Sequence, residues 1–363
     1  MAVTGRETFP SDLARFDIFS EMSRPEDLQR LKSVASNDRG LSGWFGKVSQ
    51  FVVQLLHEYR ATTTQEAIVT QWLRIDLGSI PQDLTGQIVG RERYPTAIGT
   101  FSDVWKCKYH ELTVAVKSIR GHRDDALRQH KVEQILHEQV ERWKTLTHKN
   151  VLPVYGTALD FGPLPSLVCP WVNGGSLTHY LELRSNLSPA KRHEILVQIC
   201  DGLCYLHFQD IMHGELNGAN VLMDTNGNAF LADFGFLPIV LAFRTAPYLS
   251  TAIGSSVRWA APELFEVPKS TKGPPLQLSL QSDIYSFGSI MLQVLSGNIP
   301  YHTIKRDNQV LYAIAKAMKP PRPETSNLTD EYWEFIQRCW SCRRENKRPT
   351  ATDVSTFLVA QRL

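Results

Sequence analysis

After residue 87, the main change in the spacing of the apolar residues comes near residue 177, and this change constrains the fold more than any other feature. Between residues 87 and 172, short runs alternate apolar and polar residues, which is typical of strands that are buried on one face. From Leu177 onward the apolar residues recur mostly at helical spacing. The pattern therefore predicts an α+β fold in which a small sheet region precedes a large helical region. We expect a ligand site in the cleft between the two.

The individual elements follow from the same spacing. Five strands and one helix are expected in the sheet region, and one hairpin interrupts the later helices, with Asn226-Gly227 as its two-residue turn. The expected strands span residues 87–94, 101–109, 112–119, 150–156 and 165–172, the first helix spans 125–146, the hairpin spans 221–233, and the later helices span 189–208, 283–295, 309–316, 330–339 and 351–361.

Residues 1–88 have a different pattern, which predicts a helical N-terminal extension. Ser23 and Glu26 have the spacing of a capping box that begins a helix. Residues 44–59 place one wide apolar face on a helix. Two interpretations stay open. The extension is a small bundle packed on the following domain, or it offers a helix to a protein partner.

Composition argues against several classes of function. The formal net charge of the 363-residue chain is +2, so we expect no nucleic-acid partner. No stretch approaches the ~20 apolar residues that span a bilayer, and the first residues lack the apolar core of a signal peptide, so we expect no membrane association. The six cysteines are too few for a disulfide framework in a chain of this length, which indicates a reducing compartment. We expect the cytoplasm, with the nucleus as an open alternative.

Two stretches of the sheet region contain residues suited to binding a nucleotide. On the expected strand 112–119, Ala115 and Lys117 share one face, where the small Ala leaves room for a flat base and the Lys reaches phosphates. Upstream, "AIGTFSDV" resembles a phosphate-covering loop in which only the middle glycine, Gly99, is present. That glycine is the one that most needs close backbone approach to phosphates. A lysine on a strand is more often simply exposed, so the first stretch is weak by itself.

The expected hairpin brings together two side chains that suit a metal ion. Asn220 comes directly before its first strand and Asp233 directly after its second, so pairing of the strands places the two residues side by side. Mg²⁺ prefers oxygen ligands, keeps few protein ligands and bridges phosphate oxygens. The sequence therefore predicts a magnesium site at Asn220 and Asp233.

Further motifs follow in a characteristic order. They are "HGELNGAN" at residues 213–220, "LADFGF" at 231–236, "RWAAPE" at 258–263, "SDIYSFG" at 282–288 and "CWSCRRENKRP" at 339–349. In this order and at these spacings, residues 89–363 resemble the eukaryotic protein-kinase family. The last three motifs look like the tyrosine-kinase-like branch. The wording "YPTAIGTFSDVWK" and "HKNVLPVYG" is similar to kinase-like proteins of mushroom-forming fungi.

The resemblance implies a two-lobed fold, with a small five-stranded lobe and long helix at about residues 89–169 and a large, mainly helical lobe at about 173–363. It implies ATP and Mg²⁺ as cofactors. The catalytic positions match Lys117 as the phosphate anchor, Glu215 in the slot of the base, and Asp233, which with Asn220 would hold the metal. The positions that would contact the nucleotide match Ala97, Ile98, Gly99, Val104, Ala115, Lys117, Cys169, Val172 and Leu222.

The catalytic loop departs from the family pattern at three positions. Glu215 stands where the family has Asp, so the carboxylate is longer by one methylene. Gly214 replaces an Arg, and Asn217 replaces the Lys that would stabilise charge on the transferred phosphoryl group. Losing such a donor typically slows transfer some hundreds-fold, by about 3–4 kcal/mol. A later arginine, Arg244 or Arg258, is a candidate replacement for the missing charge.

Two further expectations concern ion pairs. Glu263 and Arg348 match the pair that braces the large lobe. The family partner of Lys117 is a Glu on the long helix, and the matching position holds Gln139, with Glu138 beside it. Which of these two residues faces the site stays open.

Two functions follow. The leading one is a protein kinase that transfers the γ-phosphate of ATP to protein Ser or Thr, slowly because of the altered loop. Tyr is less expected, because Ser256 occupies the slot that receives the substrate residue. The alternative is a nucleotide-binding pseudokinase that acts as a signalling scaffold. The expected partners are a protein substrate and a protein that binds the N-terminal helices.

Overall fold

A computed structural model of the chain describes residues 80, 82–99, 102–120, 126–235, 254–265, 278–343 and 347–361. All of them belong to one of the two compact units of the chain, residues 67–363. The predicted helices before residue 80 and the candidate cation Arg244 lie outside the described residues.

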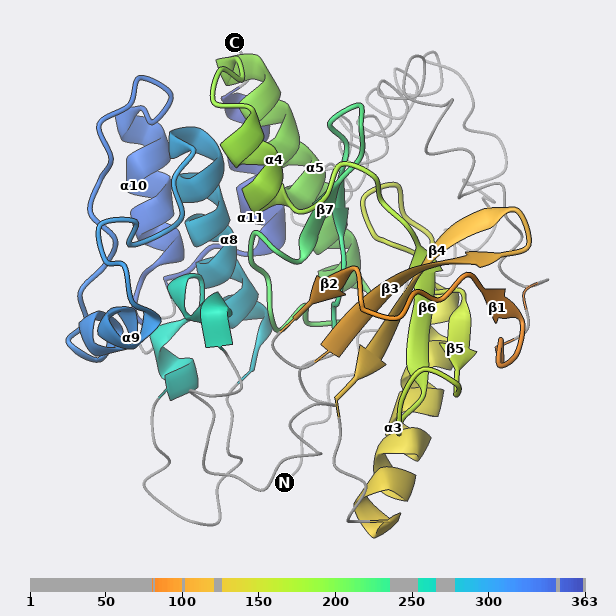
Figure 1. The fold of residues 1–363 in the computed structure, drawn as a ribbon. Coiled ribbons are helices and arrows are strands. Elements are labelled where there is room, and N and C mark those ends of the chain that lie inside the picture. Colours follow the sequence, from red (N-terminus) through yellow and green to blue (C-terminus); the bar gives the residue numbers. More distant parts are fainter. Residues whose placement is uncertain are drawn as a thin grey trace, which may run out of the picture. The chain divides into compact units, whose positions relative to one another are not determined.

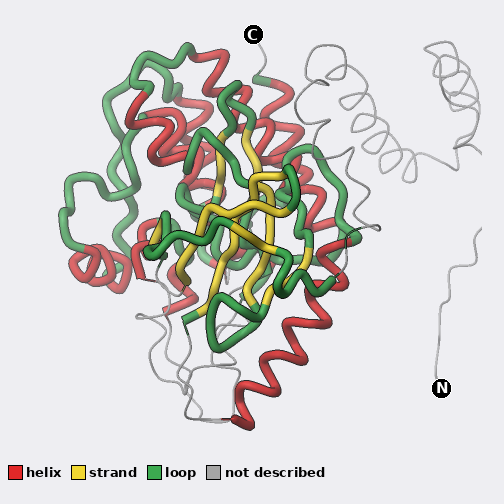
Figure 2. The backbone as a smooth tube through the Cα atoms, turned by 45° about the vertical axis from the view of Figure 1, so that its right-hand side comes forward, coloured by secondary structure: helices red, strands yellow, loops and turns green. Residues whose placement is uncertain are grey.

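The sheet region contains an antiparallel sheet with the strand order β1-β3-β4-β6-β5 (Figure 1). A short strand, β2, pairs with β3 beside this path. The helix α3 (Ala126–Lys144) follows β4 in the chain and runs beside the strands (Figure 2). The strands are β1 (Ile88–Val89), β2 (Ala97–Ile98), β3 (Ser102–Tyr109), β4 (Leu112–Ile119), β5 (Gly156–Ala158) and β6 (Ser166–Pro170).

The two long strands show why the sheet forms here. Residues that alternate along β3 and β4 point to opposite faces, and one set is buried in an apolar cluster while the other is only partly covered. The buried face includes Trp105, Cys107, Val114 and Val116. The partly covered face includes Lys117, so the predicted nucleotide residues lie on the face opposite to the apolar cluster.

Two of the predicted strands differ from the structure. The segment 150–156 is buried, but before β5 begins at Gly156 only the single residue Val151 forms a bridge, to Leu231. Pro153 has no N–H to donate to a neighbouring strand, which is a physical reason for the late start. The predicted strand at residues 87–94 is reduced to Ile88–Val89.

The helical region agrees closely with the predicted spans. The helices α5 (Pro189–Phe208) and α10 (Asp330–Cys339) begin and end at the predicted residues. Ser188 caps α5 by accepting the Lys191 N–H at 3.2 Å, with Pro189 at the first position. The remaining elements are α4 (Leu177–Leu183), α8 (Leu280–Ser296), α9 (Asp307–Ala315), α11 (Ala351–Ala360) and the short 3₁₀ helices η3 (Gly254–Arg258) and η4 (Pro262–Phe265).

The hairpin between α5 and η3 corrects the predicted turn. Its strands β7 (Val221–Met223) and β8 (Ala229–Leu231) pair as expected. The tight turn spans residues 224–227, because the Gly227 N–H donates to the Asp224 carbonyl at 3.1 Å. Gly227 is therefore the last residue of the turn instead of one of its two central residues, and it has a φ of 82°, where glycine has no Cβ penalty. The Asp224 carboxylate also accepts the N–H groups of Asn226 and Asn228, both at 2.8 Å, and so stabilises a longer loop than two residues.

A large apolar cluster joins α3 to the helices α4, α5, α8, α10 and α11. Cys200 lies in this cluster on α5, as its helical spacing with Cys204 predicts. Among the described residues, no helix is both long and apolar enough to cross a membrane.

Acidification is expected to destabilise the protein, because the fold holds the His148 ring in its neutral form. The ring is stacked on Tyr205 with centroids 4.8 Å apart, and its Nδ1 accepts the Asn150 N–H at 3.1 Å. Burial first, and the charge of Lys149 second, lower the pKa of His148 from 6.5 to about 4. The folded protein therefore holds the ring neutral. This contribution is fully present above pH 6.5 and is lost as the pH falls towards 4.

We expect a loss of about 3 kcal/mol between pH 7 and pH 4 from this residue. Urea unfolding at several pH values measures it. A His148→Phe variant keeps the ring stack and should show that much less pH dependence. Equal pH dependence in the two proteins would contradict the assignment.

Candidate active site

Two predicted site residues from distant parts of the chain are in direct contact. Lys117 on β4 places its Nζ 2.5 Å from Oδ2 of Asp233, which follows β8. Their side chains are 17% and 25% exposed, so the pair is partly shielded from water yet still accessible to a ligand. Asp233 has a φ of 62°, an uncommon conformation for a non-glycine residue that clusters at functional sites.

The sheet register aligns further predicted residues with Lys117. Val104 on β3 lies opposite Lys117, and Ala97 on β2 lies opposite Val104. Ala115 lies opposite Cys169 on β6. Directly opposed residues share a face of an antiparallel sheet, so all five lie on the face that carries Lys117.

The residues expected to surround a nucleotide base also come together. Val172 is buried in a small apolar cluster, and Cys169 and Leu222 pack against it. Burial raises the pKa of the Cys169 thiol to about 12, with a smaller contribution from Asp233, so the thiol is not a nucleophile at neutral pH. Sequence reasoning missed the rest of this cluster, whose members come from segments that only the fold brings close: Leu152, Phe230 and Ala232.

The loop expected to cover the phosphates is held by a residue that the sequence did not indicate. The Gly99 N–H donates to the Ser102 carbonyl at 2.8 Å, which closes the loop. Arg120, directly after β4, donates from Nη2 to the carbonyls of Gly99 and Ser102. Its Nε lies 3.4 Å from the Asp103 carboxylate. Arg120 thus fixes both ends of the loop, while the side chain of Ile98 is 73% exposed.

Glu215 lies close to the Lys117–Asp233 pair. The pKa of its carboxyl is raised to about 7, chiefly by burial; Asp233 also raises it, whereas Lys117 and a hydrogen bond from Ser256 lower it. The Ser256 hydroxyl donates to Glu215 Oε1 at 3.1 Å. A carboxyl group with a pKa near 7 suits proton transfer at neutral pH.

Asn217 shapes the catalytic loop from inside it. Its Nδ2 donates to the Glu215 carbonyl at 3.0 Å, and its Oδ1 accepts the N–H groups of Ala219 at 2.8 Å and Asn220 at 3.2 Å. The side chain is buried, so its polar atoms are used within the loop and supply no charge. Asn217 is therefore a positioning residue for the loop in this structure.

The proposal that Arg258 replaces the missing cation is wrong. Its guanidinium is buried and donates to Asp307 at 2.8 Å and to the Tyr301 carbonyl at 3.0 Å. Further hydrogen bonds reach Pro300, Ile304 and Lys305. These contacts fix Arg258 on the segment around α9, because each of its donors already has a partner there.

The start of the catalytic loop is anchored by the α8 residue Asp283. Its carboxylate accepts the N–H groups of His213 at 2.8 Å and Gly214 at 2.9 Å, and it contacts His207 Nε2 at 2.9 Å. Gly214 adopts a φ of 80°, which glycine occupies without strain. The His213 carbonyl in turn accepts the Gly235 N–H at 3.0 Å, which ties this loop to the segment after Asp233.

The helix α3 packs against the same segment. Trp143 is buried, and its ring meets that of Phe234 edge to face, with centroids 6.0 Å apart. On the same helix, Gln139 is half-buried and Glu138 is exposed. Gln139 is thus the one of the two that is turned towards the protein.

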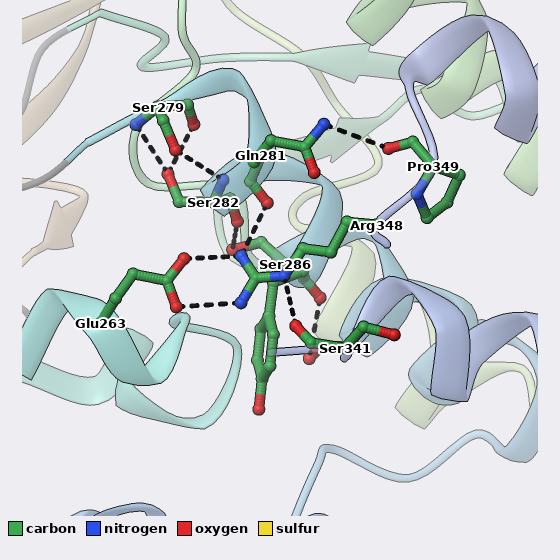
Figure 3. A network of polar contacts seen from close by, with 10 residues as sticks. Glu263, Ser279, Gln281, Ser282, Ser286, Ser341, Arg348 and Pro349 are labelled. Carbon is green, nitrogen blue, oxygen red and sulfur yellow. Dashed lines mark hydrogen bonds and ion pairs between the residues drawn. The ribbon is translucent and has the colours of Figure 1, made fainter. Parts of the chain in front are cut away.

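The predicted Glu263–Arg348 ion pair is confirmed (Figure 3). The two hydrogen bonds from the Arg348 guanidinium to the Glu263 carboxylate measure 2.6 and 2.9 Å, and the side chains of Arg348 and Glu263 are 2% and 7% exposed. Arg348 also donates to the carbonyls of Gln281 at 3.0 Å and Ser341 at 2.8 Å. It therefore joins η4, the start of α8 and the segment after α10.

The hairpin brings the segments of Asn220 and Asp233 close together, because the N–H of Ala232, the residue before Asp233, donates to the Asn220 carbonyl at 2.9 Å. The Asn220 Nδ2 donates to the Glu215 carbonyl at 2.9 Å, which leaves its amide oxygen as the atom suited to a metal. Within the described ranges, no group of three or more His, Cys, Asp or Glu residues forms a metal site. This donor set fits Mg²⁺, which binds through one or two protein oxygens together with phosphate oxygens.

Comparison with known proteins adds to this geometry. A family model described as protein tyrosine and serine/threonine kinase matches residues 96–358. Serine/threonine-protein kinase STY46 of Arabidopsis thaliana is 27% identical over 260 residues, which are 71% of this chain and 42% of that protein. Kinase suppressor of Ras A of Caenorhabditis elegans is 27% identical over 294 residues, 79% of this chain and 36% of that protein.

Mitogen-activated protein kinase kinase kinase 2 of Arabidopsis thaliana is 29% identical over 223 residues, 61% of this chain and 32% of that protein. The chain spans less than half the length of each of these relatives.

Proposed function

Because this chain belongs to the protein tyrosine and serine/threonine kinase family, we propose that it transfers the γ-phosphate of ATP to hydroxyl groups of a protein. One observation carries the proposal. Lys117, Asp233 and Glu215, which come from three separate segments, converge on one place in the fold. Phosphoryl transfer needs this combination of a cation, a metal-binding carboxylate and a base.

Each residue has a role that its surroundings support. Lys117 binds phosphate oxygens in place of its present contact with Asp233. Asn220 and Asp233 would hold Mg²⁺, which when bound neutralises charge on the phosphates. Glu215 accepts the proton of the attacking hydroxyl, and its pKa of about 7 leaves a large fraction in the ionised form at neutral pH.

Ser or Thr is the proposed acceptor. The hydroxyl of Ser256 donates to Glu215, so it lies beside the base and is placed to orient a small acceptor there. The names of two relatives, serine/threonine-protein kinase STY46 and mitogen-activated protein kinase kinase kinase 2, are consistent with a protein acceptor.

The transfer is proposed to be slow. Asn217 supplies no positive charge to the transferred phosphoryl group, and Arg258 is held elsewhere by its contact with Asp307. Loss of one such donor corresponds to about 3–4 kcal/mol in the barrier. The same features favour the alternative, a pseudokinase that binds nucleotide and acts as a signalling scaffold.

Several finer points stay predictions: membership of the tyrosine-kinase-like branch, similarity to fungal proteins, a cytoplasmic location and a protein partner for residues 1–88. The boundaries of the extension and of the lobes, at residues 88, 169 and 173, stay predictions as well.

The two functions separate in one experiment. The purified full chain is incubated with γ-labelled ATP, Mg²⁺ and a generic protein acceptor, beside a Lys117→Met variant that keeps most of the side-chain length but loses the charge. Label above the level of the variant supports the kinase. Equal background, with a melting temperature that ADP raises only in the unmodified chain, supports the pseudokinase. No label and no ADP effect would overturn both.

A further inference from the structure

A short segment before β1 binds both the sheet and α3. We call Ile80 and residues 82–85 the N-terminal strap. The Leu84 N–H donates to the Thr157 carbonyl at 2.7 Å, and the Thr157 N–H donates to the Gln82 carbonyl at 2.8 Å. The strap therefore pairs with the outer edge of β5 through a parallel bridge. Leu84 and Ile80 are buried, 0% and 6% exposed, in the apolar cluster under the sheet.

The strap also holds one face of α3. The Gln82 amide nitrogen lies 3.1 Å from His137 Nδ1 and 3.5 Å from the His137 carbonyl. Two helical turns further on, Lys144 Nζ donates to the Ile80 carbonyl at 2.8 Å. Residues seven apart share a helix face, so the two contacts grip the same side of α3. Hydrogen bonds depend on direction, so these two contacts fix the rotation of α3 about its own axis more closely than apolar packing alone would.

The neighbouring face of α3 meets the active site. Leu136, Val140 and Trp143 are buried in the large apolar cluster, and Trp143 packs on Phe234, the residue after Asp233. A Cβ at Gly235 would lie 3.3 Å from the Trp143 ring, so the fit there is tight. A rotation of α3 by one residue, about 100°, would break the strap contacts and move Trp143 off Phe234 together.

We propose that the N-terminal strap is a positioning element for the active site. By fixing α3 it fixes Trp143 against Phe234, and thereby Asp233 opposite Lys117. The inference rests on the proposed function only in taking a nucleotide as the ligand of that site. Nucleotide binding and strap docking should then favour each other, because coupling between two sites is reciprocal.

The test compares the unmodified chain with Gln82→Ala and with Lys144→Met, which removes the ammonium and keeps the stem. In the nucleotide-free proteins, hydrogen exchange of the Gly235 amide, followed in peptides covering residues 230–235, should be several-fold faster in both variants. Lys149→Met is the control. Lys149 forms an ion pair with Asp201 of α5 at 3.5 Å, so this change removes a lysine whose ion pair involves neither the strap nor α3. Its exchange should match that of the unmodified chain.

The second readout is affinity for ADP with Mg²⁺, well below the melting temperature. We expect about five- to tenfold weaker binding in the two strap variants. In the unmodified chain, ADP should slow exchange of the Leu84 and Thr157 amides. Unchanged Gly235 exchange in both variants overturns the inference, as does equal ADP affinity in all proteins. If the unmodified chain binds no ADP, the proposed function fails, and the exchange comparison still decides the role of the strap.

Discussion

An Asp233→Asn variant is expected to transfer phosphate roughly a hundred- to a thousandfold more slowly than the unmodified chain while keeping its fold. The asparagine has the same shape but no charge, so it holds Mg²⁺ poorly and no longer pairs with Lys117, whose Nζ lies 2.5 Å from the carboxylate. Asp233 is partly exposed, and replacing it removes no apolar contact. Label transfer from ATP to a generic protein acceptor measures the effect.

The metal dependence of ADP binding tests whether the slower transfer comes from loss of the metal ligand. In the unmodified chain, Mg²⁺ should strengthen ADP binding, and in Asp233→Asn that gain should disappear. Asp201→Asn is a matched control, because Asp201 is also a partly exposed carboxylate in an ion pair, with Lys149. Transfer at the normal rate by Asp233→Asn would exclude Asp233 as the metal ligand and, with it, the proposed mechanism.

Replacing Arg348 by alanine is expected to destabilise the domain by about 3–5 kcal/mol. The Glu263 carboxylate, 7% exposed, would be left as a buried charge without its guanidinium partner. The carbonyls of Gln281 and Ser341 would each lose a hydrogen-bond donor as well (Figure 3). Urea unfolding followed by circular dichroism measures the change in free energy.

An exposed pair serves as the comparison for this variant. Arg322 contacts Asp330 at 2.6 Å, but the side chains are 39% and 79% exposed. Arg322→Ala should therefore cost less than about 1 kcal/mol. The double variant Glu263→Gln, Arg348→Ala should lose less stability than the sum of the single changes, because the uncompensated charge is absent. A small loss in Arg348→Ala, similar to that of Arg322→Ala, would contradict the bracing role.

Much of the fold could be predicted from residues that are close to one another in the chain. The spans of α5 and α10 follow from the caps at Ser188 and Thr329 and from helical spacing, which involve residues a few positions apart. The pairing of β7 with β8, which brings the segments of Asn220 and Asp233 close together, follows from a hairpin of neighbouring strands. The turn itself was misplaced, because the Asp224 side chain selects a longer loop.

Other features of the site needed the tertiary structure. Asn217 looked like a lost cation, and only its contacts show that it positions the loop. Arg258 was a candidate for the missing cation, but its N–H groups donate to Asp307 and Tyr301 around α9. Arg120 and the N-terminal strap gave no signal in the sequence, because their partners are distant in the chain. Arg120 contacts Gly99, Ser102 and Asp103. The strap contacts α3 and Thr157.

By itself, the sequence determined most of the helices, the two long strands and the hairpin strands, and which family the motifs resemble. These properties depend on periodicity and on contacts between near neighbours in the chain. The tertiary structure alone decided that Lys117 meets Asp233, that Glu215 lies half-buried near them, and that α3 is held between the strap and Phe234. Those outcomes depend on burial and on contacts between distant segments, which only the packed chain creates.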